Sequence, residues 1–336
     1  MNSMVWSFLN SLIGRNDIME FTRSYFEGEE REGFFIQPLM KRVWAAQLEV
    51  LQEIDNICKR HHIKYFAEWG TLLGAVRHKG YIPWDDDLDI GMLREDFVRF
   101  LHYAKKEIPK GYAVVDLNDE RFDELMARVM NSDRILPEDQ EFLKKFHGCP
   151  YGVGVDITCL DHIPKNKEDE EILLTWLYVT NSLGRNWDSD EDTLENKMEC
   201  LKLIEEETGF HFNEKTSIKR QLLQLSDKIA AMYYDAESDE VTIMCMLTSD
   251  PDYRLPVSCY DNIIEVPFEN TIIPIPAEYD RILRLRYGDN YMTPIRDYDG
   301  GCLDHEYPYF LNQVEWLRNT YKKQGLELPE CFSWKQ

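Results

Sequence analysis

Hydrophobic residues recur at helical spacing in several parts of the chain. Between residues 43 and 58, apolar pairs repeat every seven residues, with further apolar residues between them. Similar stripes occur over residues 94–105 and 218–232. A stripe of this kind forms the buried face of an amphipathic helix. The pattern therefore predicts helices in these three segments, and a further helix from about Ala277.

Shorter apolar or alternating segments predict strands between these helices. They are HHIKYFAEW at 61–69, YAVVDL at 112–117, the segment around 125–130, VGVDITCL at 153–160, and the strand pair IIEVPFENTIIPIP at 263–276. Strands that alternate with helices predict the α/β (α+β) class, with a mixed sheet core and flanking helices.

Pattern and composition divide the chain into four parts. Residues 1–36 are interpreted as a peripheral lead-in, and residues 37–164 carry the predicted core. Charge is dense and helical stripes dominate over residues 165–240, which predicts a helical insertion or subdomain. Residues 241–336 return to strands and complete the core domain.

Composition restricts the classes of function. The chain has 336 residues, of which 43% are hydrophobic and 12% aromatic, so it can bury a full core. Its formal net charge of −24 argues against a nucleic-acid partner, because phosphate backbones are bound by clustered Lys and Arg. A nucleotide-sized ligand in a local basic pocket remains open.

The eight cysteines are scattered and form no C-x-x-C pair, which argues against a zinc ribbon or a redox motif. They are expected to be reduced thiols of a cytoplasmic protein. The first residues lack the basic region and the cleavage site of a signal peptide. No segment approaches the ~20 apolar residues of a membrane span.

The segment YIPWDDDLDIGM, residues 81–92, contains four closely spaced aspartates. A solvated acidic turn is the simplest interpretation of such a run. After Pro83, however, the residues alternate with the period of a strand. Asp85, Asp87 and Asp89 are therefore expected to share one face of an extended segment, with Asp86 pointing away.

A calcium-binding EF-hand loop fits this segment poorly. When the loop starts at Asp85, Ile90 stands where an EF-hand needs glycine, and Asp96 stands where it needs glutamate. A second interpretation is the Asp-x-Asp motif of nucleotide-sugar glycosyltransferases, in which a metal ion is held against a diphosphate. Such enzymes usually place a longer nucleotide-binding region before the motif than this chain has.

A nucleotidyltransferase-type site is the third interpretation. It needs a Gly-Thr turn that opens a helix, two aspartates on a strand, and a third acidic residue on a neighbouring strand. Gly70-Thr71, with Thr71 as a possible N-cap, offers backbone N–H groups to phosphate. Asp87, Asp89 and Asp156 can together hold Mg²⁺, and the bound cation offsets their mutual repulsion.

The segment GTLLGAVRHKGYIPWDDDLDIGMLREDF resembles the signature of the LicD family of phosphotransferases, which is also seen in fukutin-related proteins. VDITCLDHIP, VPFENTIIPIPAEYDRILRLRYGDNYMTP and a late His305 resemble the family too. The resemblance runs from about Tyr65 to His305, with a variable middle. It implies a nucleotidyltransferase-like core for residues 37–164, completed by residues 241–336.

The resemblance also implies an activity. It is the metal-dependent transfer of a phospho-alcohol, phosphocholine first among the candidates, from a CDP-linked donor to a glycan hydroxyl. CDP-choline is the expected donor, Mg²⁺ or Mn²⁺ the cofactor and CMP a product, and fukutin-like members use CDP-ribitol. The acceptor would be a cell-surface glycan, such as lipopolysaccharide or teichoic acid, or its precursor, reached in the cytoplasm or at the inner membrane surface. A glycosyltransferase and a non-catalytic metal- or nucleotide-binding module stay open as alternatives.

Individual residues receive roles on this basis. Asp87, Asp89 and Asp156 are expected metal ligands, although Asp156 is also explained by a strand-end pair with an arginine. Asp85 is a third ligand or the base that accepts the proton of the acceptor hydroxyl. The residues expected to hold the donor phosphates are Gly70, Thr71, Arg77, His78 and Lys79, and those expected at the acceptor or the pocket wall are Trp84, Arg128 and His305.

Overall fold

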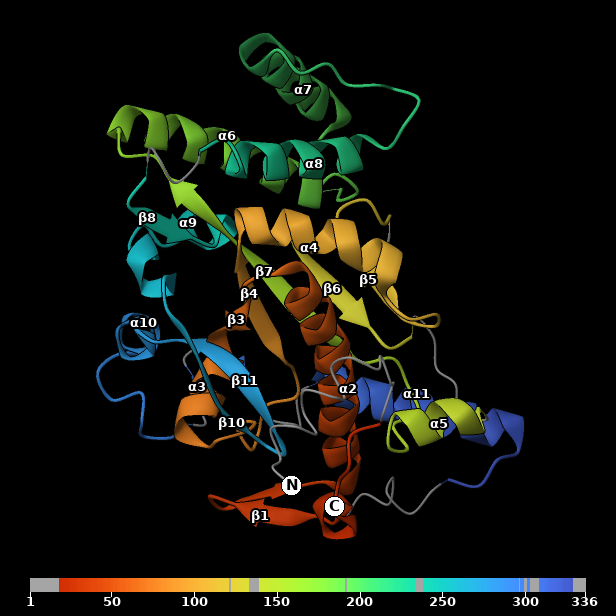
Figure 1. The fold of residues 1–336 in the computed structure, drawn as a ribbon. Helices are drawn as coiled ribbons and strands as arrows, with labels where there is room; N and C mark the ends of the chain where they lie inside the picture. The colour runs from red at the N-terminus through yellow and green to blue at the C-terminus, as the bar shows by residue number, and fades with distance from the viewer. Residues whose placement is uncertain are drawn as a thin grey trace.

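The structure is a computed structural model that describes residues 18–120, 122–132, 139–190, 192–233, 238–295, 297–298, 301–302 and 308–328. Figure 1 shows a central sheet with helices packed on it, a layer of helices at one end and a small hairpin at the other. This arrangement confirms the expected α+β class with a mixed sheet.

The sheet consists of short strands around one long strand. They are Phe66–Ala67 (β3), Asp89–Leu93 (β4), Ala113–Val115 (β5), Met126–Met130 (β6), Gly154–Ile163 (β7), Glu240–Thr242 (β8) and Leu255–Pro256 (β9). The main path runs β3–β4–β7–β6–β5, and β8 and β9 extend the sheet beside the last residues of β7. The β4–β7 pair is parallel and the other pairs are antiparallel, so the sheet is mixed.

Two amphipathic helices, α2 (Pro38–His61) and α4 (Arg94–Glu107), lie in front of the sheet in Figure 1 and contact β7. The helices predicted over residues 43–58 and 94–105 are thereby confirmed. α2 begins earlier than its apolar stripe because Pro38 suits the first turn of a helix. Three basic residues in its last turn complement the negative end of the helix dipole.

A second group of elements lies beside the β3 edge of the sheet, at the lower left of Figure 1. It contains α3 (Trp69–Arg77), the antiparallel hairpin β10–β11 (Ile263–Phe268 and Thr271–Pro276), and α10 (Tyr279–Tyr287). The hairpin and the start of α10 match the strand pair and the helix predicted there. α3 contacts β4, β10 and α10, so it joins the N-terminal and C-terminal halves of the core.

The described part of the lead-in forms a 3-10 helix, η1 (Arg23–Phe26), and a hairpin, β1–β2 (Glu29–Arg31 and Phe34–Ile36). Arg31 ties this hairpin to the core through Glu269, with Nη1 2.9 Å from Oε1. Smaller or peripheral elements outside the helical layer are α5 (Gln140–Lys145), α9 (Met244–Leu247), η3 (Val257–Tyr260), β12 (Asp297–Tyr298), β13 (Gly301–Cys302) and α11 (Pro308–Gln324).

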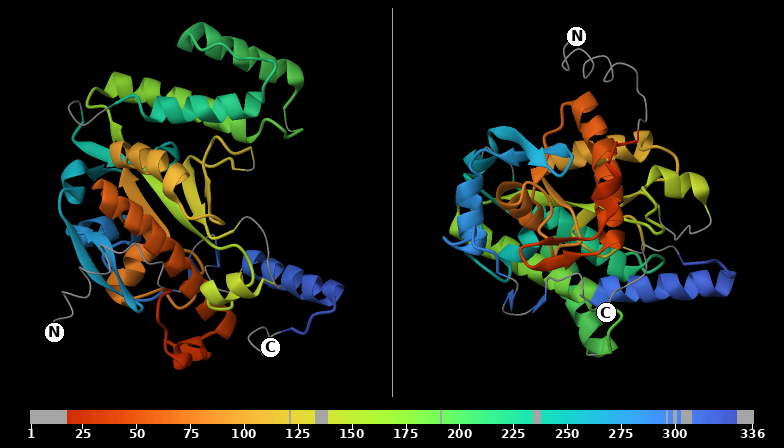
Figure 2. Two further views of the ribbon diagram at one scale, coloured as in Figure 1. Left: turned by 45° about the vertical axis from the view of Figure 1, so that its right-hand side comes forward. Right: turned by 90° about the horizontal axis from the view of Figure 1, so that it is seen from below.

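Three helices form the layer at the upper end of Figure 1, and α7 projects furthest from the body in Figure 2. They are α6 (Lys167–Arg185), α7 (Leu194–Thr208) and α8 (Ile218–Ala230). Asn166, Thr193 and Ser217 cap their first turns with side-chain oxygens. The layer has its own hydrophobic cluster, whereas Met232, expected in the apolar stripe, lies beyond α8 and is exposed. The boundaries at residues 165 and 240 stay a prediction.

Two expectations from composition concern cysteines and membrane helices. The cysteines whose side chains the structure describes are free. Within the described ranges, no helix combines the length and apolar character that crossing a bilayer requires.

Arg94, at the start of α4, joins the helical layer to the sheet. Its Nε and Nη2 lie 2.6 and 2.8 Å from the carboxylate oxygens of Asp161 on β7, and its Nη1 lies 2.9 Å from Asp227 on α8. Asp161 is only 3% exposed. A buried carboxylate of this kind requires a partner, so Arg94 links α4 to β7 and α8.

We expect Arg94→Met to lower the free energy of unfolding by about 3–5 kcal/mol, because Asp161 would be left buried without its partner. Urea denaturation followed by circular dichroism measures this loss. Arg284→Met is the control, since Arg284 and Asp280 form an exposed pair whose removal should change stability little. Equal losses in the two variants would show that the Arg94 cluster is not a structural link.

Candidate active site

The aspartate segment is a loop that leads into β4, and the strand begins only at Asp89. Asp87, which was expected on the strand together with Asp89, therefore lies in the loop before it. Side chains of α2 explain the difference: Trp44 Nε1 donates to the Asp85 carbonyl (3.0 Å), and Gln47 Nε2 donates to the Asp86 carbonyl (2.9 Å). These carbonyls are thus bonded to α2 rather than to a neighbouring strand.

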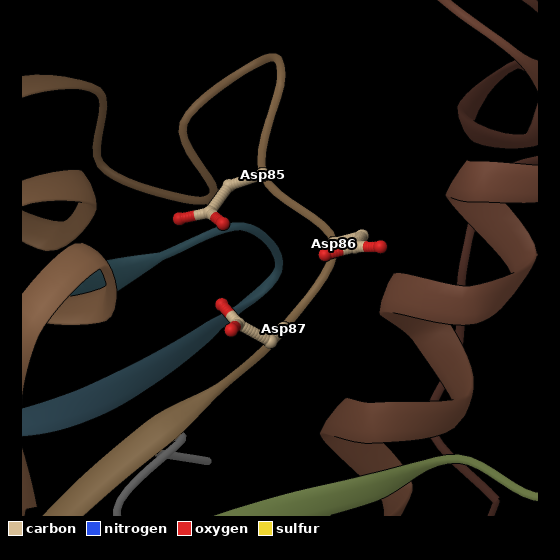
Figure 3. Close-up of side chains that lie close together, drawn as sticks. All are labelled: Asp85, Asp86 and Asp87. Carbon is tan, nitrogen blue, oxygen red and sulfur yellow. The ribbon is translucent and has the colours of Figure 1, made fainter. Parts of the chain in front are cut away.

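The loop nevertheless gathers carboxylates. One oxygen from each of Asp85, Asp86 and Asp87 lies within 4.8 Å of the others. Figure 3 shows Asp85 and Asp87 on the side of the loop toward α3, and Asp86 on the side toward α2. Asp86 thus points to the other side of the loop, as expected, whereas Asp89 was expected beside Asp85 and Asp87. Asp89 lies instead at the buried end of the same acidic site, as the first residue of β4.

Two hydrogen bonds fix the backbone of Asp89 to the start of α3. The Asp89 N–H donates to Thr71 Oγ1 (2.8 Å), and the Glu68 N–H donates to the Asp89 carbonyl (3.0 Å). Glu68, rather than Thr71, stands at the N-cap position. The expected capping role of Thr71 is therefore wrong, because its hydroxyl joins α3 to β4 instead.

Gly70 allows the acidic loop to approach the first turn of α3. A Cβ atom at this position would lie 2.5 Å from Asp85 Oδ2, so the Asp85 carboxylate would have to move away. The lack of a Cβ therefore lets a carboxylate stand against a helix start. This is the helix start that the sequence assigned to donor phosphates.

Asp156 lies beside Asp89, because the two are paired in the parallel register of β4 and β7. It forms a two-point ion pair with Arg128 of β6, in which Nη2 lies 2.7 Å from Oδ2 and Nε contacts Oδ1. The arginine pair considered as an alternative explanation of Asp156 is thus present. Its carboxylate still belongs to the acidic site, since its charge contributes to raising the pKa of Asp87 and of Asp89.

Burial raises the pKa of every aspartate in the block, and neighbouring negative charges add to the effect. Burial, followed by the charge of Asp87, raises the pKa of Asp85 and of Asp89 well above the usual range. The same two causes raise the pKa of Asp86 to about 6, and burial also raises that of Asp87. Several converging carboxylate oxygens fit a hard divalent cation such as Mg²⁺ or Mn²⁺.

The aspartates open into a pocket that gathers segments from both ends of the core. Its described lining residues are Trp69, Gly70, Leu73, Arg77, Ile82, Trp84, Asp85, Asp87, Asp89, Tyr287, Tyr291, Thr293 and Ile295. The predicted Gly70, Arg77 and Trp84 are thereby brought to the three aspartates. Tyr287 ends α10, and the other residues of the stretch from Tyr287 to Ile295 follow it. The resemblance covered the stretch, but Tyr291, Thr293 and Ile295 received no role from the sequence, because only the fold brings them near.

The basic residues Arg77, His78 and Lys79, at the end of α3 and just after it, lie in different surroundings. Arg77 lines the pocket, and its Nη1 donates to the Tyr291 carbonyl (2.8 Å). His78 turns to Glu32, 3.3 Å away, and Lys79 is exposed, so neither belongs to the described lining of this pocket. The expected phosphate roles of His78 and Lys79 stay predictions, and His305 lies outside the described residues.

Comparisons with known proteins match this part of the chain. Residues 62–133 match the family model described as LicD/FKTN/FKRP, nucleotidyltransferase domain. This part of the chain is therefore similar to the LicD family. The matched residues include α3, the aspartate loop and β4, which supply most of the pocket's acidic wall.

Three related proteins align with the chain over only part of their own length. The lipopolysaccharide cholinephosphotransferase LicD of Haemophilus influenzae is 38% identical over 117 residues, which cover 35% of this chain and 42% of that protein. The ribitol 5-phosphate transferase FKRP of Mus musculus is 37% identical over 65 residues, 19% of this chain and 13% of that protein. An uncharacterized protein of Rickettsia typhi is 42% identical over 66 residues, which cover 20% of this chain and 21% of that protein. The chain thus matches less than half the length of each of these relatives.

A buried ion pair lies between α10 and the start of α3, next to the described lining of the pocket. Glu68 is fully buried, and the Arg286 side chain, 5% exposed, pairs with it and lies 5.3 Å from the Tyr253 ring centre. The pair joins α10 to the start of α3. Sequence reasoning missed it, since nothing in RLRYGD separates a buried arginine from a solvent-facing one.

We expect Asp89→Asn to raise the thermal stability of the metal-free protein. The folded state raises the pKa of Asp89, so its stabilising contribution is complete only below the pKa of the unfolded chain and is lost as the pH rises. Asparagine keeps the backbone bonds and removes the charge. In EDTA at pH 8, the Tm should rise by about 2–4 °C, equivalent to ~1 kcal/mol, and the gain should shrink toward pH 4.

Asp190→Asn, at an exposed position of the helical layer, is the matched control and should leave the Tm unchanged. A lower Tm for Asp89→Asn in EDTA would mean that the carboxylate stabilises the fold, contrary to the crowding described above.

Proposed function

We propose that the chain is a phosphotransferase that moves a phospho-alcohol, phosphocholine in particular, from a CDP-linked donor to a glycan hydroxyl. CMP is the second product. The observation that carries this proposal is the convergence of aspartates in a pocket at the start of α3, within the part of the chain that is similar to the LicD family. A cytoplasmic location and an acceptor in lipopolysaccharide or teichoic acid synthesis remain part of the proposal.

The names of two relatives support the class of transferred group. One is a cholinephosphotransferase and the other a ribitol 5-phosphate transferase. Both names describe the transfer of the phosphate ester of a small alcohol. The carboxylate set supports the same class, because a nucleoside diphosphate donor is handled by acidic residues together with a divalent cation.

Asp87 and Asp89, with Asp86 and Asp156 nearby, would hold Mg²⁺ or Mn²⁺, which when bound neutralises charge on the donor diphosphate and on the leaving CMP. Arg77 adds a cation of the protein itself. The Tyr291 carbonyl holds one of its N–H groups, which orients the guanidinium on the pocket wall for a phosphate oxygen.

The transfer is an in-line displacement at the phosphorus that bears the alcohol. The acceptor oxygen forms a bond to this phosphorus, the bond from phosphorus to the CMP oxygen breaks, and the hydroxyl proton departs. We assign Asp85 as the group that receives this proton. Burial and Asp87 raise its pKa well above the usual range, which makes it a stronger base than an ordinary aspartate.

Product analysis with several donors tests this function. The chain is incubated with Mg²⁺, a lipopolysaccharide or teichoic acid preparation, and CDP-choline, CDP-ribitol or UDP-glucose in turn. We expect CMP to be released from CDP-choline and choline phosphate to appear on the acceptor. Asp87→Asn should lose this turnover, and Asp190→Asn should retain it.

Other products would favour the alternatives. Release of UDP with sugar transfer would favour an Asp-x-Asp glycosyltransferase. Metal binding without turnover of any donor would favour a non-catalytic module. CMP release from CDP-ribitol alone would keep the phosphotransferase and change the alcohol.

A further inference from the structure

The pocket is lined by aromatic residues as well as by aspartates. Trp69 opens α3, Trp84 precedes the aspartate loop, and Tyr287 ends α10. All three rings line the same pocket as Asp85, Asp87 and Asp89. Three parts of the chain thus contribute aromatic residues to the pocket that contains the three aspartates.

Trp69 is held in an unusual backbone conformation. Its φ of 48° is in the left-handed region, which is rare for a bulky residue and marks local strain. Its indole Nε1 is buried, whereas the residue as a whole is half-buried and lines the pocket. The polar edge of the ring is therefore turned into the protein, which leaves the aromatic surface to face the pocket.

The charges of the pocket favour a cationic ligand group. Its described lining carries three aspartates and a single cation, Arg77, whose Nη1 already donates to Tyr291. A quaternary ammonium has no N–H to donate to a carboxylate. It is bound instead by aromatic faces and by the surrounding negative potential.

We propose that the aromatic residues Trp69, Trp84 and Tyr287 together bind the quaternary ammonium of the transferred alcohol, with Trp69 and Tyr287 as the half-buried members of this aromatic wall. This inference rests on the proposed function and adds a residue basis for choline over an uncharged alcohol. Trp84, only 4% exposed and packed at its edge against Phe34, gives the wall rigidity.

The test compares CDP-choline with its uncharged isostere, in which carbon replaces the ammonium nitrogen (CDP-3,3-dimethylbutanol). Affinities are measured by calorimetry with Mg²⁺, so no acceptor is needed. Wild type should bind CDP-choline more tightly by about 2- to 30-fold, the range of a cation–aromatic contact. Trp69→Leu should reduce this ratio toward one, and Trp69→Phe should keep most of it.

Trp316→Leu is the matched control, because Trp316 is half-exposed on α11 and does not line the pocket. Its ratio should equal that of wild type. Leucine at position 69 keeps apolar bulk in the same backbone conformation, so the comparison isolates the aromatic face.

Several results would overturn this inference. If Trp69→Leu weakens both donors equally, the ring stacks on the cytosine base instead. If wild type binds the two donors equally, no cation site exists, and this result needs no variant that might misfold. In both cases CDP-alcohols still bind and the proposed function stands, whereas failure of every CDP-alcohol to bind removes both.

Discussion

The repulsion among closely spaced carboxylates is the constraint on which this structure depends. Aspartates left to themselves would separate into solvent. Here Trp44 and Gln47 of α2 hold the carbonyls of the loop, while Thr71 and Glu68 hold the backbone of Asp89. The fold thus keeps unfavourable negative charge together at the start of β4. Burial and this neighbouring charge raise the pKa values of Asp85 and Asp89.

The cations near the site offset this charge only in part, because burial and neighbouring carboxylates still raise the pKa of Asp87 and of Asp89 despite the opposing charge of Arg128. Arg286 pairs with the buried Glu68 behind the pocket, and Arg128 pairs with Asp156 on the neighbouring strand. Among the described lining residues, Arg77 is the single cation, and Tyr291 already orients it. Negative charge therefore predominates at the loop, which suits a divalent cation and a diphosphate arriving together.

Much of this arrangement was predictable from local pattern, and the rest was not. Apolar spacing located α2 and α4, and the Gly-Thr turn with the aspartates located the site. The position of Asp87 in a loop rather than on the strand escaped prediction, because the side chains that bond this loop belong to α2, some forty residues earlier. The role of Thr71 was misjudged for the same reason, since its partner is a backbone N–H of β4. The Tyr287–Ile295 wall and the Glu68–Arg286 pair depend on contacts between distant segments, which no local periodicity records.

The central claim is that the aspartate cluster is a divalent-cation site, and Mn²⁺ titration monitored by electron paramagnetic resonance of the free ion tests it most directly. The wild-type chain should remove Mn²⁺ from solution, and Mg²⁺ should displace it. Asp87→Asn should weaken this binding by at least about tenfold, equivalent to ~1.4 kcal/mol, while Asp190→Asn should not change it. Equal Mn²⁺ binding by wild type and Asp87→Asn, or none by wild type, would contradict the account.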